Sequence, residues 1–211
     1  MTKAEIRNEI KNRIAELTEA ELQMQSEELC KIIMESKRYT SCTTLLAYMP
    51  LADEADITPV IKDALSKRKK VFLPHVFPGT SQMEFYPYNN ETEIKKGDYG
   101  ISEPLVDETK SFTKFLEKLS IQQYSPAARS SKYVDIKPHE EPVERILVLV
   151  PGRAFTKDGK RIGRGKGFYD IYFSKVPLIF NIIKSGVCLE CQLMANLPTT
   201  PDDIMMDAVY F

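Results

Sequence analysis

Apolar residues near the N-terminus recur at the spacing of amphipathic helices. Ile6, Ile10 and Ile14 stand four residues apart and therefore form one stripe along a helix. Threonine stands at positions 2 and 18, each time with glutamate three residues later, which is the capping-box pattern of a helix start. The pattern predicts two N-terminal helices, near 3–16 and 19–36.

Beyond residue 40, short apolar runs alternate with helical patterns. The run "RILVLVP" is apolar enough for a strand in the centre of a sheet. Because strands and helices alternate, the expected fold is α/β, with an open, layered α/β/α arrangement around a mainly parallel, helix-covered sheet. Strands are expected at 45–50, 71–74, 83–86, 145–151, 178–183 and near 208–211, and helices from 58, over 112–119 and from about 168.

The length and composition indicate a single domain over 1–211. The chain of 211 residues is 43% hydrophobic, which suffices for one substantial core. A polar surface excursion is expected at about 105–144. Its part at 120–144 is polar throughout and lacks apolar periodicity.

The overall charge and hydropathy argue against nucleic acid and membranes as partners. The net charge is −1, which gives no general attraction to either. No run approaches the roughly 20 apolar residues of a membrane span, and the N-terminus lacks the apolar core of a signal peptide. The sequence therefore predicts a cytoplasmic protein, expected as a monomer.

Two of the four cysteines, Cys188 and Cys191 in "CLEC", have the spacing of a redox or metal pair. A second such pair is lacking, and His75 and His139 stand far away in the sequence. Ordinary buried thiols are therefore expected, and a zinc site is the alternative.

The segment from 151 to 166 contains six cationic side chains, one acid and four glycines, and it leads into "GRGKGFYD". This motif follows an expected strand and precedes an expected helix, a position where glycines let backbone N–H groups approach an anion. Arg164 and Lys166 would add charge for a polyphosphate, and Asp170 would hold magnesium. The motif is neither the Walker pattern nor the dinucleotide fingerprint, so a solvated charged loop stays the alternative.

The longer stretch "VPGRAFTKDGKRIGRGKGFYD" resembles the signature of the 5-formyltetrahydrofolate cyclo-ligases, also called methenyltetrahydrofolate synthetases. The resemblance extends to "KAEIR", "YMPLADEADIT", "KKGDYGISEP" and "DDIMMD", and covers most of the chain outside 105–144. It implies an enzyme that uses ATP and Mg²⁺ to close 5-formyltetrahydrofolate to 5,10-methenyltetrahydrofolate, with ADP and phosphate as the other products. ATP would phosphorylate the formyl oxygen, and the neighbouring folate nitrogen would then attack the activated carbon.

The resemblance also implies an ATP site and catalytic residues. Lys3 and Arg7 would contact the phosphates, and both should face the body of the protein because they lie on or beside the stripe of Ile6. Two solvated helix charges are the alternative. Catalytic roles fall to Lys166, Arg164 and Tyr169. The full set of implied ATP contacts is Lys3, Arg7, Arg161, Gly163, Arg164, Gly165, Lys166, Gly167, Phe168 and Tyr169.

For the folate, the resemblance implies Tyr48, Glu54 and Tyr99. A carboxylate such as Glu54 accepts hydrogen bonds from the pterin N–H groups, and Tyr99 would stack on the flat ring. A core position for Tyr48 and a solvent-facing loop position for Glu54 stay open. The implied magnesium ligands are Asp170 and Asp203, with Asp207 as a weaker candidate.

The sequence departs from the family pattern at Arg153, where a small or apolar residue is usual, and in "IFNIIKSGVC". One alternative function is a nucleotide-binding regulatory or interaction protein of the same fold without folate chemistry. Another is an RNA-binding protein that uses the basic loop. The joint presence of Glu54, Tyr99, Lys166 and Asp170 favours the enzyme.

Overall fold

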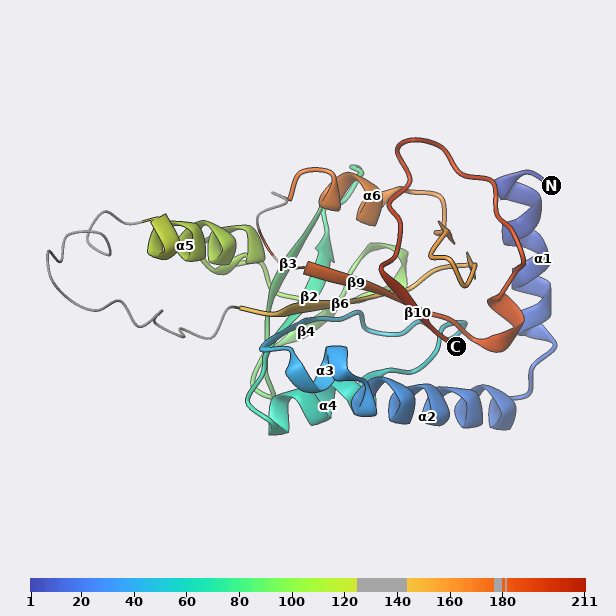
Figure 1. The fold of residues 1–211 in the computed structure, drawn as a ribbon, viewed down its shortest axis with the longest axis horizontal. Helices are drawn as coiled ribbons and strands as arrows, with labels where there is room; N and C mark the ends of the chain where they lie inside the picture. Colours follow the sequence, from blue (N-terminus) through green and yellow to red (C-terminus); the bar gives the residue numbers. More distant parts are fainter. Residues whose placement is uncertain (125–143, 177–179, 181) are drawn as a thin grey trace, which may run out of the picture.

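The computed structural model describes residues 1–124, 144–176, 180 and 182–211. The strands of its main sheet are β1 (Thr44–Leu46), β2 (Lys70–Val76), β3 (Met83–Tyr88), β6 (Ile146–Val150), β9 (Ile182–Val187) and β10 (Ala208–Tyr210). They are arranged in the order β10-β9-β6-β1-β2-β3 (Figure 1). Neighbours are parallel except β2 and β3, so the expected mainly parallel sheet is confirmed.

Helices cover both faces of this sheet, as the sequence predicts (Figure 1). Alternate residues of β6 point to opposite sides. Leu147 and Leu149 belong to the core under the first four helices, whereas Val148 and Val150 pack in the core that includes residues of the last two. The first four are α1 (Lys3–Ala15), α2 (Glu19–Glu35), α3 (Lys37–Ser41) and α4 (Thr58–Ser66), and the last two are α5 (Phe112–Tyr124) and α6 (Phe168–Phe173).

Local sequence signals determine where the N-terminal helices begin. The capping boxes of α1 and α2 are both formed, so that the threonine at each start and the glutamate three residues later bond reciprocally. Ile6, Ile10 and Ile14 are buried in the core. The predicted stripe of α1 is therefore confirmed, and it fixes the side of the helix that faces the sheet.

Several short elements were not expected from the sequence. They are α3, the hairpin of β4 (Ile94–Lys96) with β5 (Ser102–Pro104), the hairpin of β7 (Ala154–Phe155) with β8 (Arg161–Ile162), and the 3-10 helices η1 (Asp98–Gly100), η2 (Glu108–Lys110) and η4 (Glu190–Gln192). Elements of two to five residues are too short to show a period.

Several predicted boundaries differ from the structure, and the strand expected at 45–50 ends at Leu46. The strand expected at 178–183 starts at Ile182, and residues 177–179 and 181 lie outside the described residues. The helix expected over 112–119, within the segment expected as a polar excursion, is confirmed as α5, which runs further to Tyr124 and buries Phe112 and Leu116. The remainder, 125–143, lies outside the described residues. Among the described helices, none is long and apolar enough to cross a membrane.

A buried acid attaches the β4–β5 hairpin to the main sheet. Glu103 is 3% exposed, and its Oε2 lies 3.0 Å from Nδ1 of His75 on β2. Its Oε1 accepts a hydrogen bond from the backbone N–H of Val76 at 3.2 Å. A Cβ at position 97 would lie 2.3 Å from this carboxylate and would displace it from these contacts. These contacts bring the turn that contains Tyr99 to the carboxyl end of β2.

Candidate active site

A cavity of about 550 Å³ opens at the carboxyl ends of β1, β2 and β6, where ligands bind in open parallel sheets. Five cationic side chains and three carboxylates line it, so its charge is positive although the chain as a whole is nearly neutral. Apart from the weaker metal candidate Asp207, the structure brings the residues predicted for the site to this one cavity: Lys3, Arg7, Tyr48, Glu54, Tyr99, Arg161, Gly163, Arg164, Gly165, Lys166, Gly167, Phe168, Tyr169, Asp170 and Asp203.

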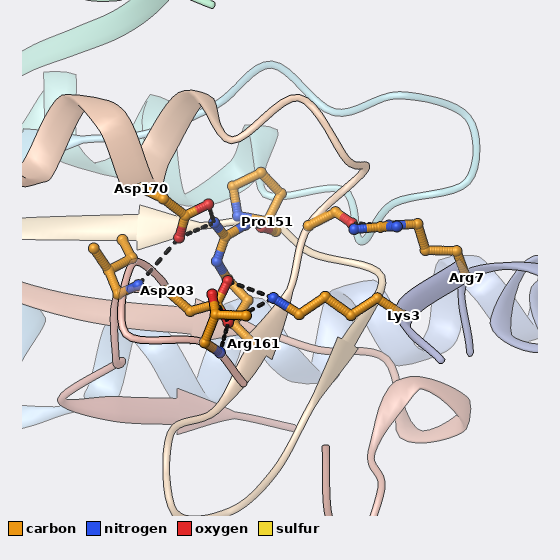
Figure 2. A network of polar contacts seen from close by, with 9 residues as sticks. Lys3, Arg7, Pro151, Arg161, Asp170 and Asp203 are labelled. Carbon is orange, nitrogen blue, oxygen red and sulfur yellow. Dashed lines mark hydrogen bonds and ion pairs between the residues drawn. The ribbon is translucent and has the colours of Figure 1, made fainter. Parts of the chain in front are cut away.

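The glycine-spaced loop needs backbone angles that other residues rarely adopt. Gly165 has a φ of 104° and Gly167 has a φ of 69°, both in the left-handed region that favours glycine. Gly167 directly precedes α6. The guanidinium of Arg7 donates through Nε to the carbonyl of Gly163 at 2.8 Å (Figure 2). Helix α1 thus lies directly against the loop, as the predicted orientation of Arg7 requires.

Lys3 pairs with a carboxylate from the other end of the chain. Its Nζ lies 2.6 Å from Oδ1 of Asp203 (Figure 2). The backbone N–H of Thr200 donates to Oδ2 of the same carboxylate at 2.6 Å. Burial by itself would raise the pKa of Asp203, but the bonds from Lys3 and Thr200 hold the pKa below its ordinary value. Asp203 is therefore ionised at neutral pH.

The second predicted metal ligand, Asp170, is held by a buried arginine. The Nη2 of Arg161 lies 3.2 Å from Oδ2 of Asp170, and Nη1 donates to the carbonyl of Pro151 at 3.1 Å (Figure 2). The backbone N–H of Ile204 donates to Oδ1 of Asp170 at 3.1 Å. Because Ile204 follows Asp203 in the chain, the two carboxylates come from segments in direct contact. Arg161 is therefore engaged in holding this carboxylate.

The two aspartates are of the chemical type that could bind a magnesium ion together with phosphate. Magnesium binds one or two protein carboxylates together with phosphate oxygens and water, and Asp170 and Asp203 line the same cavity as the five cations. Among the described residues, no three His, Cys, Asp or Glu side chains are grouped so that they would hold a metal. Phosphate oxygens would have to supply the remaining ligands.

Two of the predicted folate residues, Tyr48 and Glu54, lie in the segment that follows β1. Glu54 is 9% exposed, and its Oε2 accepts from the backbone N–H of Leu51 at 3.1 Å. Its Oε1 accepts from Nε of Arg164 at 2.9 Å. Tyr48 is buried, and its hydroxyl donates to the carbonyl of Ala55 at 3.1 Å. Tyr48 thus belongs to the hydrophobic core while it lines the cavity, whereas Glu54 can offer a carboxylate oxygen.

Tyr99 has a strained backbone in the turn between β4 and β5. Its φ of 64° is unusual for a bulky residue, and such strain often accompanies function. The side chain is 49% exposed. The ammonium of Lys166 lies 5.5 Å from its ring centroid, and the ring of Phe168 contacts it edge-on at 5.9 Å. The turn thus places an available aromatic face beside the glycine loop.

Tyr169 lines the cavity. Burial, with the nearby charge of Glu54, raises the pKa of its phenol far above the ordinary value, against the opposing effect of Arg161. The guanidinium of Arg161 lies 5.4 Å from the ring centroid. The phenol therefore stays protonated at neutral pH and can only act as a hydrogen-bond donor or a neutral acceptor.

The model of the 5-formyltetrahydrofolate cyclo-ligase family matches residues 1–121 and 109–211. These two overlapping matches together span the whole chain. The chain belongs to this family. It is therefore an enzyme of the cyclo-ligase class, and the resemblance that the sequence motifs show is confirmed.

Relatives of the cyclo-ligase family match along nearly the whole length. A probable 5-formyltetrahydrofolate cyclo-ligase from Caenorhabditis elegans is 27% identical, over 99% of this chain and 92% of the relative. The 5-formyltetrahydrofolate cyclo-ligase from Mus musculus is 23% identical, over 98% and 91%. The solved structure of a 5,10-methenyltetrahydrofolate synthetase from Aquifex aeolicus superimposes with a TM-score of 0.70 at 25% identity, over 99% of this chain and 89% of that one.

Sequence reasoning missed two features of this cyclo-ligase cavity and its surroundings. The first is an apolar wall of Met49, Leu51, Pro74, Val76, Met83 and Ile101. Such residues at strand ends look like ordinary core positions in a sequence. The second is Asp53, which does not line the cavity but pairs with Arg164. Asp53 stands 111 positions from Arg164, so no local spacing could have revealed this contact.

Two weaker sequence candidates lie elsewhere in the fold. Asp207 pairs with Lys184 of β9 at 3.2 Å and does not line the cavity. Cys188 is buried and Cys191 is partly buried, and burial raises the pKa of both thiols. His75 contacts Glu103 instead, and His139 lies outside the described residues. Ordinary thiols therefore explain "CLEC" within the described part of the chain.

Proposed function

We propose that the chain uses ATP and Mg²⁺ to close 5-formyltetrahydrofolate to 5,10-methenyltetrahydrofolate, with release of ADP and phosphate. The observation that supports this most strongly is the convergence of five cations and three carboxylates in one cavity at the carboxyl ends of parallel strands. This is the charge pattern that a magnesium-bound triphosphate requires. The names of the curated relatives supply the folate substrate.

In this proposal the triphosphate lies along the glycine-spaced loop. The backbone N–H groups around Gly165 approach the phosphates, because no side chain stands between. Lys3, Arg7 and Lys166 line the cavity beside this loop and neutralise phosphate charge. A charge-assisted hydrogen bond of this kind contributes about 1.5–3 kcal/mol. Magnesium supplies further screening of the phosphate charge when it is bound by Asp170 and Asp203.

The pterin ring of the folate lies on the apolar side of the cavity. One oxygen of Glu54 accepts hydrogen bonds from the pterin N–H groups. Tyr99 covers one face of the ring, since it is half exposed at the cavity edge. The side chains of Met49, Leu51 and Val76 exclude water from the other side. The formyl group then extends from the pterin toward the phosphates.

The reaction has two bond-forming steps. The formyl oxygen attacks the γ-phosphorus, its bond to phosphorus forms, and ADP leaves with the electrons of the broken P–O bond. The neighbouring folate nitrogen then attacks the activated carbon and loses its proton, and the C–O bond breaks to release phosphate. Arg164 and Lys166 stabilise charge on the transferred phosphoryl group, and the protonated phenol of Tyr169 offers a hydrogen bond there.

Incubation of the protein with ATP, Mg²⁺ and 5-formyltetrahydrofolate tests the proposal. The methenyl product is followed by its absorbance, and ADP is measured in the same samples. One ADP should form per methenyl product, and omission of ATP or Mg²⁺ should abolish turnover. Cyclisation at the full catalysed rate without ATP would contradict the proposal. So would a rate of ADP formation that does not depend on the folate. The monomeric state and the cytoplasmic location stay predictions from the sequence.

A further inference from the structure

A carboxylate outside the cavity holds one of its cations. Arg164 donates through both terminal nitrogens to Asp53, one contact being 3.4 Å, and donates through Nε to Glu54 at 2.9 Å. On its other side, Asp53 lies 2.6 Å from Nη1 of Arg153. Arg153 and Asp53 do not line the cavity, whereas Arg164 and Glu54 do. The guanidinium of Arg164 is thus held between a cavity carboxylate and one behind it.

Asp53, Glu54, Arg153 and Arg164 form a cluster that is partly shielded from water, which strengthens its ion pairs. The side chain of Glu54 is 8% exposed and that of Arg153 is 12% exposed, while Arg164 and Asp53 are about one-third exposed. Bidentate contacts of a guanidinium with carboxylates are the strong kind of ion pair. Burial by itself would raise the pKa of Asp53, but its bonds from Arg164 and Arg153 hold the pKa below the ordinary value. Asp53 therefore stays ionised and keeps its hold at neutral pH.

Under the proposed function, on which this step rests, both ligands need the same bond to open. Phosphate must draw Arg164 away from the two carboxylates. The pterin must take the Glu54 oxygen that Arg164 now occupies. Opening this bond costs free energy. The ligand that binds first supplies that free energy, so the second ligand binds more tightly.

We propose that Asp53 is a positioning residue that holds Arg164 on Glu54 in the free enzyme and thereby makes nucleotide and folate strengthen each other's binding. The cluster has two states, a closed one with Arg164 on Asp53 and Glu54, and a released one. Each ligand binds the released state better. The apparent dissociation constant of either ligand alone is its intrinsic value divided by the released fraction, so it rises as the closed fraction approaches one.

Two variants separate this role of Asp53 from a general effect of charge. Asp53→Asn removes the ionic hold on Arg164. Asp202→Asn makes the same change of charge at an exposed position next to cavity residue Asp203, and Asp202 makes no bond to Arg164 among the described contacts. Titration calorimetry measures the binding of a non-hydrolysable ATP analogue with Mg²⁺, first alone and then with saturating 5-formyltetrahydrofolate. The reverse titration must give the same coupling factor.

In the parent enzyme, each ligand should tighten the binding of the other by about five- to tenfold, near the lower end of typical coupling. In Asp53→Asn, each ligand alone should bind about three- to tenfold more tightly, and the coupling factor should fall toward one. Asp202→Asn should keep the coupling factor of the parent. Asp53→Ala should behave like Asp53→Asn, and thermal unfolding shows whether each variant is folded.

Three outcomes would overturn the inference: a coupling factor of one in the parent, an unchanged factor in both folded Asp53 variants, or an equal loss in Asp202→Asn. Failure of the proposed function looks different. In that case the parent would bind no folate or no nucleotide, and no coupling factor could be measured. A parent that binds and converts both ligands without coupling leaves the proposed function standing and removes only the role of Asp53.

Discussion

The ammonium of Lys3 lies 2.6 Å from the carboxylate of Asp203, 200 positions further along the chain. This ion pair joins the first helix to the C-terminal segment across the cavity. It places a cation that suits phosphate next to a carboxylate that suits magnesium. When a triphosphate and its metal bind, Lys3 would contact phosphate and Asp203 would contact the metal instead of each other. The two side chains would then have different roles, and each role can be tested by its own substitution.

We expect Asp203→Asn to lower the apparent affinity for magnesium far more than Asp202→Asn does. Only Asp203 lines the cavity and pairs with Lys3. Loss of one carboxylate ligand should raise the magnesium concentration for half-maximal activity about tenfold, since each 1.4 kcal/mol of binding is tenfold in affinity. Magnesium titrations of activity at saturating ATP measure this. Equal curves for the two variants would remove Asp203 from the metal site.

The same carboxyl group should make stability depend on pH in acid. The pKa of Asp203 in the folded protein is below its ordinary value of 3.8. A group with a lowered folded pKa stabilises the protein above its unfolded pKa, and this contribution is lost as the pH falls through the folded pKa. The free energy of unfolding of the parent should therefore fall more than that of Asp203→Asn between about pH 5 and pH 2. Urea unfolding at each pH measures this free energy. If it falls equally with pH in the parent and in Asp203→Asn, the lowered pKa of Asp203 is wrong.

We expect the glycine loop to bind phosphate through its backbone and through Lys166. A side chain at position 165 would have to adopt a φ of 104°, with its Cβ 3.5 Å from the guanidinium carbon of Arg7. Gly165→Ala should therefore fold with reduced stability and bind Mg-ATP poorly. Lys166→Ala should bind about tenfold to a hundredfold more weakly, which corresponds to one charge-assisted bond.

Lys157 provides the matched control for Lys166. It belongs to the same basic segment, but its ammonium lies 4.8 Å from the ring centroid of Phe211, and it does not line the cavity. Lys157→Ala should therefore bind Mg-ATP like the parent in calorimetric titrations. If all three variants weaken binding equally, the loop contributes only a diffuse positive field.

Substitution of Tyr99 should separate stability from substrate binding. Tyr99→Gly relieves a φ of 64° in a bulky residue, so the melting temperature should be unchanged or higher. The variant lacks the ring proposed to cover the pterin, so KM for the folate should rise about tenfold, in the range of one stacking contact. Tyr99→Phe should keep the parent KM. A folate KM that is unchanged in Tyr99→Gly would exclude the stacking role.

The sequence predicted those features that depend on neighbouring residues. The stripe of Ile6, Ile10 and Ile14 determined the side of α1 that faces the sheet, and so correctly placed Lys3 and Arg7 toward the protein body. The motif "GRGKGFYD" similarly predicted the loop before α6. These signals succeed because helix period and glycine conformation are local properties.

Features that depend on tertiary contacts were missed. The strand expected at 178–183 is displaced to Ile182–Val187. The residues "KSG" within it lack the apolar character that would indicate a buried strand. A Cβ at Gly186 would lie 2.5 Å from the ring of Phe155, so packing against β7 explains that glycine. Likewise, the bond of Asp53 to Arg164 joins two loops 111 positions apart. No periodicity in a sequence reports such contacts.

The fate of the formyl oxygen tests the proposed chemistry most directly. The enzyme is given ATP, Mg²⁺ and 5-formyltetrahydrofolate labelled with ¹⁸O in the formyl group, and the released phosphate is analysed by mass spectrometry. In the proposed mechanism the formyl oxygen attacks the γ-phosphorus and later leaves with it, so each phosphate formed should contain one ¹⁸O atom. If the label instead appears in water and the phosphate is unlabelled, the formyl oxygen is not phosphorylated and the proposed mechanism is wrong.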